Sequence, residues 1–248
     1  MLNEIYLANY CAMFSGYGKW EAPVWFIGIE EAGGYNESTA AAHIGTWHER
    51  GRVSLDSVPE FCRASGIHQW HGNDAKPQPT WEQLIRLLLV AQGKPDSPAA
   101  ILDYQRARLG VATGETCLLE LFPLPSPSVR VWNYGKWTTL PWLQTRPAYE
   151  QKIAAQRIEA IRAKIELCKP PVVVFYGSSQ LKHWRKIMGA GTYARPIADK
   201  LIAHERDGTA FFVIKQPGNF WHRTKRDDYF REIGHYFSTI VPGDDADK

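Results

Sequence analysis

The sequence predicts an α/β protein with a three-layer α/β/α arrangement, in which helices flank a short, mainly four-stranded parallel sheet. Two observations carry this prediction: short apolar runs alternate with longer segments of helical periodicity, and each run ends in a loop that holds Gly, Pro or Ser. Such alternation is typical of parallel strands joined by helices. The predicted strands are Val24–Ile29, Cys117–Phe122, Val172–Tyr176 and Ala210–Lys215.

Three segments between and after these strands carry helix signals. Thr80 and Gln83 predict a capping box at the start of a helix, and Gly93 is expected to end it. Residues 148–169 place four isoleucines on one broad face, and two prolines separate this segment from the third strand. Residues 226–240 predict a last helix.

The chain of 248 residues is long enough for one large domain, and we expect a single domain over residues 1–248. Residues 35–79 show no strong strand pattern and are rich in Gly, His and Trp, so they are interpreted as an insertion. The polar tail at 243–248 is expected to fray. Because loops that follow parallel strands meet at one edge of a sheet, we expect a shared cleft there, with the insertion over it.

Composition excludes several classes of function. The four cysteines include no CxxC pair, which argues against zinc and iron–sulfur sites, and their wide spacing is typical of a reducing compartment. The histidines of the insertion lack a standard ligand spacing. No apolar run approaches the ~18 residues of a membrane span. We therefore expect a cytoplasmic monomer that uses no membrane, metal or cofactor.

The four loops after the strands, "GIEEAGG", "LFPLPSPS", "YGSSQLK" and "KQPGNFWHRTK", together resemble the motifs of the uracil-DNA glycosylase superfamily. The first motif of that family is often GQDPYH, GMNPG or GEAPG, and a later strand ends in LLN. A Gly-Ser loop and an HPS motif follow. The resemblance implies an enzyme that flips a base out of double-stranded DNA, hydrolyses its N-glycosidic bond and leaves an abasic site.

The resemblance also implies catalytic residues. Glu30 stands at the Asp position of GQDPYH, with Glu31 as the alternate. A carboxylate can stabilise the oxocarbenium-like sugar and take a proton from water. Gln216 replaces the His of HPS and carries no charge, which either weakens the help for the leaving base or shifts this role to His222 or Lys215. The alternative for Glu30 and Glu31 is capping of a helix N-terminus.

Two departures from the family bear on the base. Ala32 replaces the Tyr of GQDPYH, and with the glycines after it this opens the side of the pocket where a C5 substituent would project; a tight turn is the alternative. Glu120 replaces the Asn of LLN, and a carboxylate only accepts hydrogen bonds, which favours the N4 amino group of cytosine over O4 of uracil. Alternatively, Glu120 caps a loop or pairs with Arg130. The base-binding candidates are Gly28, Ile29, Ala32, Gly33, Glu120 and Phe122.

The last loop has the composition of a wedge that fills the space of an extruded nucleotide. Phe220 or Trp221 would intercalate, and Arg223, Lys225 and Arg226 would hold phosphates. The hydroxyl groups of two other loops are further phosphate contacts. The DNA-binding candidates are Ser126, Ser128, Ser178, Ser179, Lys182, Asn219, Phe220, Trp221, Arg223 and Lys225.

The resulting hypothesis is a monofunctional DNA glycosylase that removes a C5-modified cytosine, such as glucosylated hydroxymethylcytosine, from bacteriophage DNA as antiviral defence. One alternative is a repair glycosylase for uracil or another deaminated base. A second is a catalytically inactive DNA-binding relative. A third is an unrelated α/β hydrolase that acts on free nucleosides and binds DNA weakly.

Overall fold

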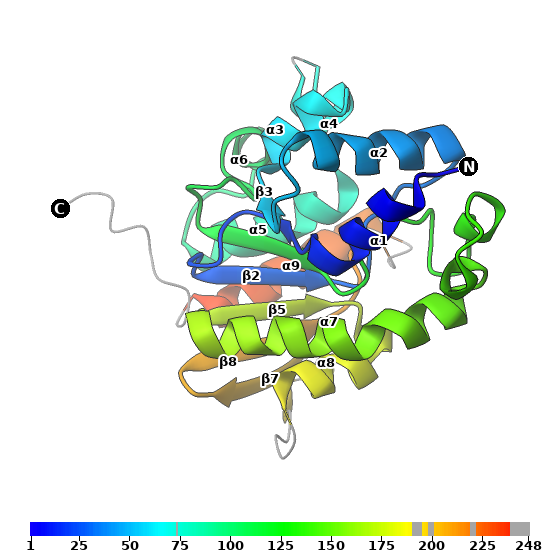
Figure 1. Ribbon diagram of the computed structural model, residues 1–248. Coiled ribbons are helices and arrows are strands. Elements are labelled where there is room, and N and C mark those ends of the chain that lie inside the picture. Colours follow the sequence, from blue (N-terminus) through cyan, green and yellow to red (C-terminus); the bar gives the residue numbers. More distant parts are fainter. Residues whose placement is uncertain (73, 190–194, 198–200, 219–221, 239–248) are drawn as a thin grey trace.

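The computed structural model describes residues 1–72, 74–189, 195–197, 201–218 and 222–238. In this part of the chain, nine α-helices surround a mixed eight-stranded sheet with the strand order β3-β1-β4-β2-β5-β8-β7-β6 (Figure 1). The strands are β1 (Gly16–Tyr17), β2 (Val24–Gly28), β3 (Leu55–Asp56), β4 (Thr116–Glu120), β5 (Val172–Tyr176), β6 (Arg195–Ile197), β7 (Leu201–Arg206) and β8 (Thr209–Ile214).

The centre of the sheet is the block β4-β2-β5-β8, in which all neighbouring strands are parallel. Val24 of β2 is in register with Thr116 of β4 and with Val172 of β5. Every residue of β2 and β5 is buried, which explains why these strands are continuous apolar runs rather than alternating ones. The prediction of four parallel strands is confirmed, with ends within two residues of those expected.

The sheet is wider than the sequence predicted. β1 and β3 have two residues each, too few to show a periodicity, and β3 lies within the 35–79 segment, where no strand was expected. β7 and β8 form an antiparallel hairpin around Asp207 and Gly208, which have φ of 53° and 82°. Two positive φ values are typical of a type I′ turn, and an Asp-Gly pair is its usual signal. The sequence therefore contains a hairpin signal at Asp207 and Gly208, although no hairpin was predicted there.

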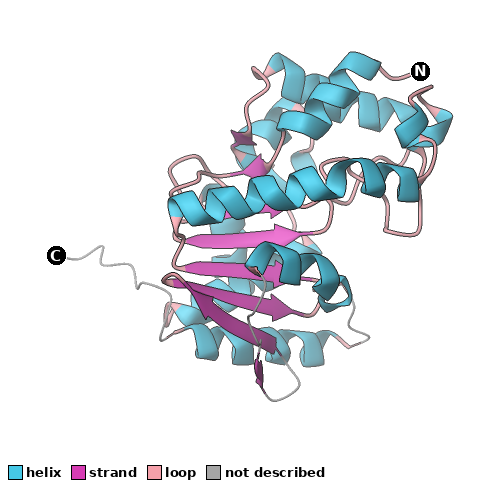
Figure 2. Ribbon diagram, turned by 60° about the horizontal axis from the view of Figure 1, so that its bottom comes forward, coloured by secondary structure: helices cyan, strands magenta, loops and turns pink. Residues whose placement is uncertain are grey.

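Helices cover both faces of the sheet (Figures 1 and 2). Phe175 stacks on Trp184 of α8 with ring centroids 5.0 Å apart and also on Phe211, whereas Phe212 meets Phe237 of α9 at 4.1 Å. Because residues 211 and 212 point to opposite faces of β8, α8 and α9 lie on opposite sides. Helix α7 packs with α8, and α5 packs with α9. The α-helices are α1 (Glu4–Met13), α2 (Glu37–Glu49), α3 (Val58–Ala64), α4 (His68–His71), α5 (Pro79–Ala91), α6 (Pro98–Ala107), α7 (Arg146–Cys168), α8 (Leu181–Met188) and α9 (Arg223–Phe237).

The predicted helices exist, but their starts differ. Helix α5 begins at Pro79, and its cap is Gln78, whose side-chain oxygen accepts from the amides of Thr80 and Trp81 at 2.7 Å each. The prediction of Thr80 as N-cap is therefore wrong. Gly93, at φ 67°, follows the end of this helix as expected. The four isoleucines of α7 are all buried, as predicted.

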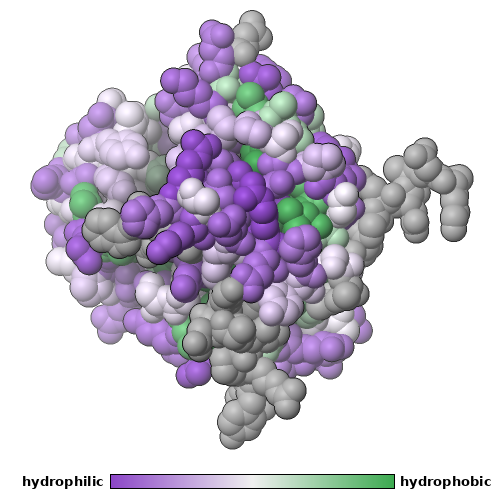
Figure 3. Space-filling view, turned by 180° about the vertical axis from the view of Figure 1, so that it is seen from behind, coloured by the Kyte–Doolittle hydropathy of each residue, from purple (hydrophilic) through white to green (hydrophobic). Residues whose placement is uncertain are grey.

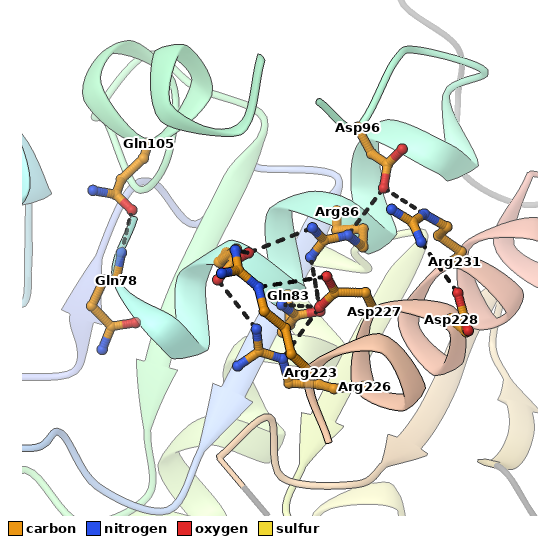
Figure 4. Close-up of polar contacts among 11 residues, drawn as sticks. Gln78, Gln83, Arg86, Asp96, Gln105, Arg223, Arg226, Asp227, Asp228 and Arg231 are labelled. Atoms are coloured by element: carbon orange, nitrogen blue, oxygen red, sulfur yellow. Dashed lines mark hydrogen bonds and ion pairs between the residues drawn. The ribbon is translucent and has the colours of Figure 1, made fainter. Parts of the chain in front are cut away.

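Helices α5 and α9 lie on the side of the sheet away from the viewer in Figure 1, and that side carries a strongly hydrophilic area when seen from behind (Figure 3). Between the two helices, the Arg86 side chain is only 3% exposed and lies within 3.0–3.5 Å of Asp96, Asp227 and Glu82 (Figure 4). Arg226 adds a contact to Glu82 at 3.4 Å. This network ties the start of α9, and hence the end of the loop after β8, to α5.

Candidate active site

A pocket lies at the carboxyl ends of the central strands. The chain passes from β2 to β4 on one side and later returns to β5 on the other side of β2, so the end of β2 is a topological switch point. A cavity of about 180 Å³ opens there and is lined by residues that end or follow all four parallel strands. The expectation of one shared cleft is therefore confirmed. These residues are Glu30, Glu31, Glu120, Tyr176 and Gln216.

The 35–79 segment forms another wall of this cavity. His43 comes from α2, Phe61 and Cys62 come from α3, and Trp70 comes from α4. His43 packs against Phe61 with ring centroids 4.8 Å apart. The segment thus encloses the pocket with aromatic and neutral side chains, as expected of an insertion over the cleft.

Glu31 is a carboxyl group of the pocket that has no lysine or arginine partner among the described residues. Its Oε2 accepts a hydrogen bond from the Tyr17 hydroxyl at 3.3 Å and lies 3.4 Å from Nε2 of His43. Burial raises the pKa of Glu31 to about 7, and burial lowers the pKa of His43 to about 4. His43 is therefore neutral near pH 7, and Glu31 titrates in the range where a general base is most useful.

Glu30 is held differently. Arg146, the first residue of α7, binds it with both terminal nitrogens, at 2.6 Å (Nη1–Oε2) and 3.2 Å (Nη2–Oε1). The Glu30 side chain is 4% exposed; burial raises its pKa, and the Arg146 contacts oppose that shift. Arg146 also donates to Ser126 Oγ at 2.9 Å and to the carbonyl of Val131. Glu30 is thus engaged in an ion pair with Arg146. Glu31, which the sequence offered as the alternative catalytic residue, has no such pair among the described residues and can act on a ligand in the pocket.

Neither glutamate caps a helix. The next helix, α2, begins six residues after Glu31, and Asn36 is its N-cap. The loop instead bonds to the loop after β4: the amide of Ser126 donates to the carbonyl of Glu31 at 2.9 Å. Gly34 adopts φ 56° and lies against Pro125, so a turn requirement explains this glycine.

Glu120 ends β4 and pairs with Tyr176, the last residue of β5. The Tyr176 hydroxyl donates to Oε1 of Glu120 at 2.7 Å, while Oε2 is buried without a partner among the described residues. A Cβ at Gly28 would collide with both the Tyr176 hydroxyl and Glu120 Oε2, so only glycine leaves room for this pair. The suggested contact with Arg130 is not present; Arg130 is exposed.

Burial raises the pKa of Glu120 well above its usual range. The Tyr176 hydrogen bond opposes the shift, and the charges of Glu31 and Glu30 add to it. Arg157 is close, but it donates to the backbone carbonyls of Glu120 and Leu121 rather than to the carboxyl group. These effects together favour the neutral, protonated form of Glu120. A neutral carboxyl group both donates and accepts hydrogen bonds, so Glu120 is restricted to accepting them only in its ionised form.

Of the remaining base-binding candidates, some lie at the pocket and others do not. Ala32 lines the pocket and is exposed, and Gly28 lies beneath the Glu120–Tyr176 pair. Ile29, Gly33 and Phe122 do not line the cavity. Phe122 is a buried core residue that packs on His183 and Tyr149 and does not line the cavity, so its assignment to the pocket is wrong.

The DNA-binding candidates differ in whether they are buried, exposed or outside the described residues. Ser126 is buried, and its hydroxyl is used by Arg146 and by the carbonyls of Ser128 and Val131, so it cannot hold a phosphate. His222 precedes α9, is exposed and does not line the pocket. Exposed on the surface are Ser128, Ser178, Ser179, Lys182, Arg223 and Lys225. Asn219, Phe220, Trp221 and the tail 243–248 lie outside the described residues.

Sequence reasoning missed Tyr17, His43, Arg146 and Tyr176. Tyr17 sits in a two-residue strand that gives no pattern, and Arg146 is 116 residues from its partner Glu30. Tyr176 could have been found, because it ends a predicted strand, as Glu120 ends β4 in the structure.

No family model matches this chain, and no curated protein matches it either. Within the described residues, no helix is long and apolar enough to cross a membrane, and no group of three or more His, Cys, Asp or Glu side chains is arranged to hold a metal ion. The fold and the pocket therefore define an α/β protein with a carboxyl-lined site at the switch point of its sheet.

Proposed function

We propose that this protein is a DNA glycosylase that hydrolyses the N-glycosidic bond of a base flipped out of double-stranded DNA. The observation that carries the proposal is the pocket itself, where the loops resembling the uracil-DNA glycosylase motifs bring Glu31 and Glu120 together at the carboxyl edge of the sheet. Ligands of open α/β sheets bind at this position.

Glu31 has the properties that this hydrolysis needs. Cleavage of the bond develops positive charge on the sugar, and the attacking water must lose a proton. With a pKa of about 7, Glu31 is ionised in roughly half of the molecules at pH 7 and can take that proton. Its negative charge also stabilises the sugar cation in a site shielded from water. Glu30 contributes by fixing the loop through Arg146.

The size of the pocket favours a single base. At about 180 Å³ it is smaller than the roughly 300–1,000 Å³ of sites for drug-sized ligands, so it suits a base better than a whole nucleotide. Because Ala32 is small and exposed, the pocket is open on that side, and a C5 substituent of the base would project out of the pocket there. We therefore favour a C5-modified cytosine, such as glucosylated hydroxymethylcytosine in phage DNA, with antiviral defence as the role.

The surface around the pocket offers groups for DNA phosphates. Ser178, Ser179 and Lys182 follow β5, and Arg223 and Lys225 follow β8; all five are exposed. Binding through such cations releases counterions, so affinity for DNA should fall steeply as salt rises.

The test is cleavage of a DNA panel, read as alkali-labile breaks. The duplexes contain uracil, cytosine, hydroxymethylcytosine or glucosylated hydroxymethylcytosine at one position. We expect cleavage at the modified cytosines, and a loss of about 10²-fold or more in rate for Glu31→Gln. The control is Glu159→Gln, an exposed change on α7.

Other outcomes separate the alternatives. Cleavage of uracil alone would indicate a repair enzyme, and salt-sensitive binding without breaks would indicate an inactive relative. Hydrolysis of free nucleosides with weak DNA binding would indicate an unrelated hydrolase. Full activity of Glu31→Gln would refute the assigned role of Glu31.

A further inference from the structure

Oε2 of Glu120 is a buried polar atom with no hydrogen-bond partner among the described residues, and Glu120 is one of the residues that line the cavity. Buried polar atoms are nearly always paired, so such an atom in a pocket indicates a group that a ligand would satisfy. Tyr176 holds the other oxygen of the same carboxyl at 2.7 Å and so fixes the direction of Oε2. The Glu120 carboxyl group and the Tyr176 hydroxyl also lie directly against Gly28, which restricts the position of Oε2 further.

The charges around this carboxyl oppose its ionisation. Arg157 is the nearby cation, and its donors are directed to backbone carbonyls. Both Glu30 and Glu31 bring like charge, and only Glu30 has an arginine partner. Two carboxylates so close disfavour a third negative charge. The titratable groups that face Glu120 are Tyr176 of β5, Glu30 and Glu31 after β2, and Arg157 of α7.

Glu31 lies in a different environment. The groups that interact with it are Tyr10, Tyr17, His43 and Cys62 on one side and Glu120 and Tyr176 on the other, and none of these is a lysine or an arginine. The pocket therefore holds two carboxyl groups whose surroundings separate their proton affinities. Such a pair is the usual arrangement of a general base and a general acid in one site.

We propose that Glu120 is the general acid of this site and donates its Oε2 proton to an acceptor atom of the flipped base as the glycosidic bond breaks. This inference rests on the proposed glycosylase function. Tyr176 is the positioning residue, because it touches Glu120 rather than the reacting atoms.

Protons and electrons are conserved in this step. The electron pair of the C1′–N bond goes to the base, and the Glu120 proton goes to N3 or O2 of a cytosine, which leaves as a neutral molecule. Water adds to C1′ and gives one proton to the Glu31 carboxylate. Glu120 then regains a proton from solvent and Glu31 releases one, so the net reaction is hydrolysis.

The assignment explains the uncharged Gln216 at the position where the family has a histidine. Gln216 lines the pocket, but its amide group can only donate a hydrogen bond and has no acidic proton to transfer. Cytosine is a poor leaving group as an anion, so its removal needs a proton more than the removal of uracil does. Glu120 supplies that proton from the end of β4, whereas Gln216 follows β8; these are the two outer strands of the parallel block.

The kinetic test is the single-turnover rate of cleavage at a modified cytosine as a function of pH. The wild-type rate should fall on the acid side, as Glu31 is protonated, and on the alkaline side, as Glu120 loses its proton. Glu120→Gln keeps the shape but has no acidic proton, so it should lose about 10²-fold or more and lose the alkaline decline. Tyr176→Phe should slow the reaction and move that decline to higher pH, since the hydroxyl favours the ionised form. Glu159→Gln should match the wild type.

A second measurement does not depend on activity. The infrared carbonyl band of a protonated carboxyl group should be present at pH 7 in Glu31→Gln and absent in the double variant Glu31→Gln/Glu120→Gln, because Glu31 itself is protonated in part of the wild-type molecules at that pH. An ionised Glu120 at pH 7 would overturn the inference, and so would an unchanged alkaline decline in Glu120→Gln. If the wild type cleaves none of the duplexes, the proposed function fails, and the infrared result then shows separately whether Glu120 is an acid in this pocket.

Discussion

Replacing Arg146 with methionine tests how the first post-strand loop is held. The change removes both hydrogen bonds to Glu30, whose side chain is 4% exposed, and leaves a buried carboxylate without a partner. Breaking a buried pair from one side costs about 3–5 kcal/mol. That is a large share of the roughly 5–15 kcal/mol that stabilises a domain. We expect Arg146→Met to unfold at a clearly lower urea concentration than the wild type at pH 8.

The loss should depend on pH with a definite sign. Burial raises the pKa of Glu30, and the arginine opposes this, so its removal raises the pKa further. A carboxyl with a raised folded-state pKa loses stability as pH rises and regains it as pH falls. The deficit of Arg146→Met should therefore shrink between pH 8 and pH 5, and adding Glu30→Gln should restore part of it.

Urea unfolding at the two pH values measures this difference. The control is Arg162→Met on the same helix, whose side chain is 38% exposed and whose pairs with Glu159 and Glu166 lie on the surface. Surface pairs are worth about 0–1 kcal/mol. If Arg146→Met were no less stable than Arg162→Met, or if its deficit did not change with pH, the structural role assigned to Glu30 would be wrong.

Three further predictions follow from the pocket and the helices behind it. The free energy of unfolding of Glu31→Gln should rise relative to that of the wild type as pH increases from 4.5 to 7, by up to about 3 kcal/mol. The reason is that the folded wild type keeps the Glu31 proton up to about pH 7, whereas the unfolded chain loses it near the ordinary pKa of 4.5. Equal pH dependence of the two proteins in urea unfolding would contradict this. Gly28→Ala should displace the Glu120–Tyr176 pair and reduce cleavage far more than it reduces the melting temperature, whereas Gly45→Ala, which meets nothing within 4 Å, should change neither. Arg86→Met should lower the free energy of unfolding by about 3–5 kcal/mol, and a loss under 1 kcal/mol in urea titration would show that the α5–α9 network does not depend on it.

The sequence by itself determined the central strands. Val24, Val172 and their neighbours are apolar on both sides of the strand, and only a parallel strand covered by helices on both faces requires this. The same rule placed the loops after these strands at one edge, and with them Glu30, Glu31 and Glu120. The hairpin at Asp207 and Gly208 was also within reach of the sequence.

Only the tertiary structure decided what each site residue does. Glu30 and Glu31 are neighbours of the same type, and they differ because Arg146, 116 residues away from Glu30, reaches one and not the other. The pKa of Glu120 is raised because the fold buries its carboxyl group beside Glu31 and Glu30, and Arg157 donates to backbone carbonyls instead. Proton affinity depends on burial and on charges brought from distant parts of the chain, and a linear pattern of residue types contains neither.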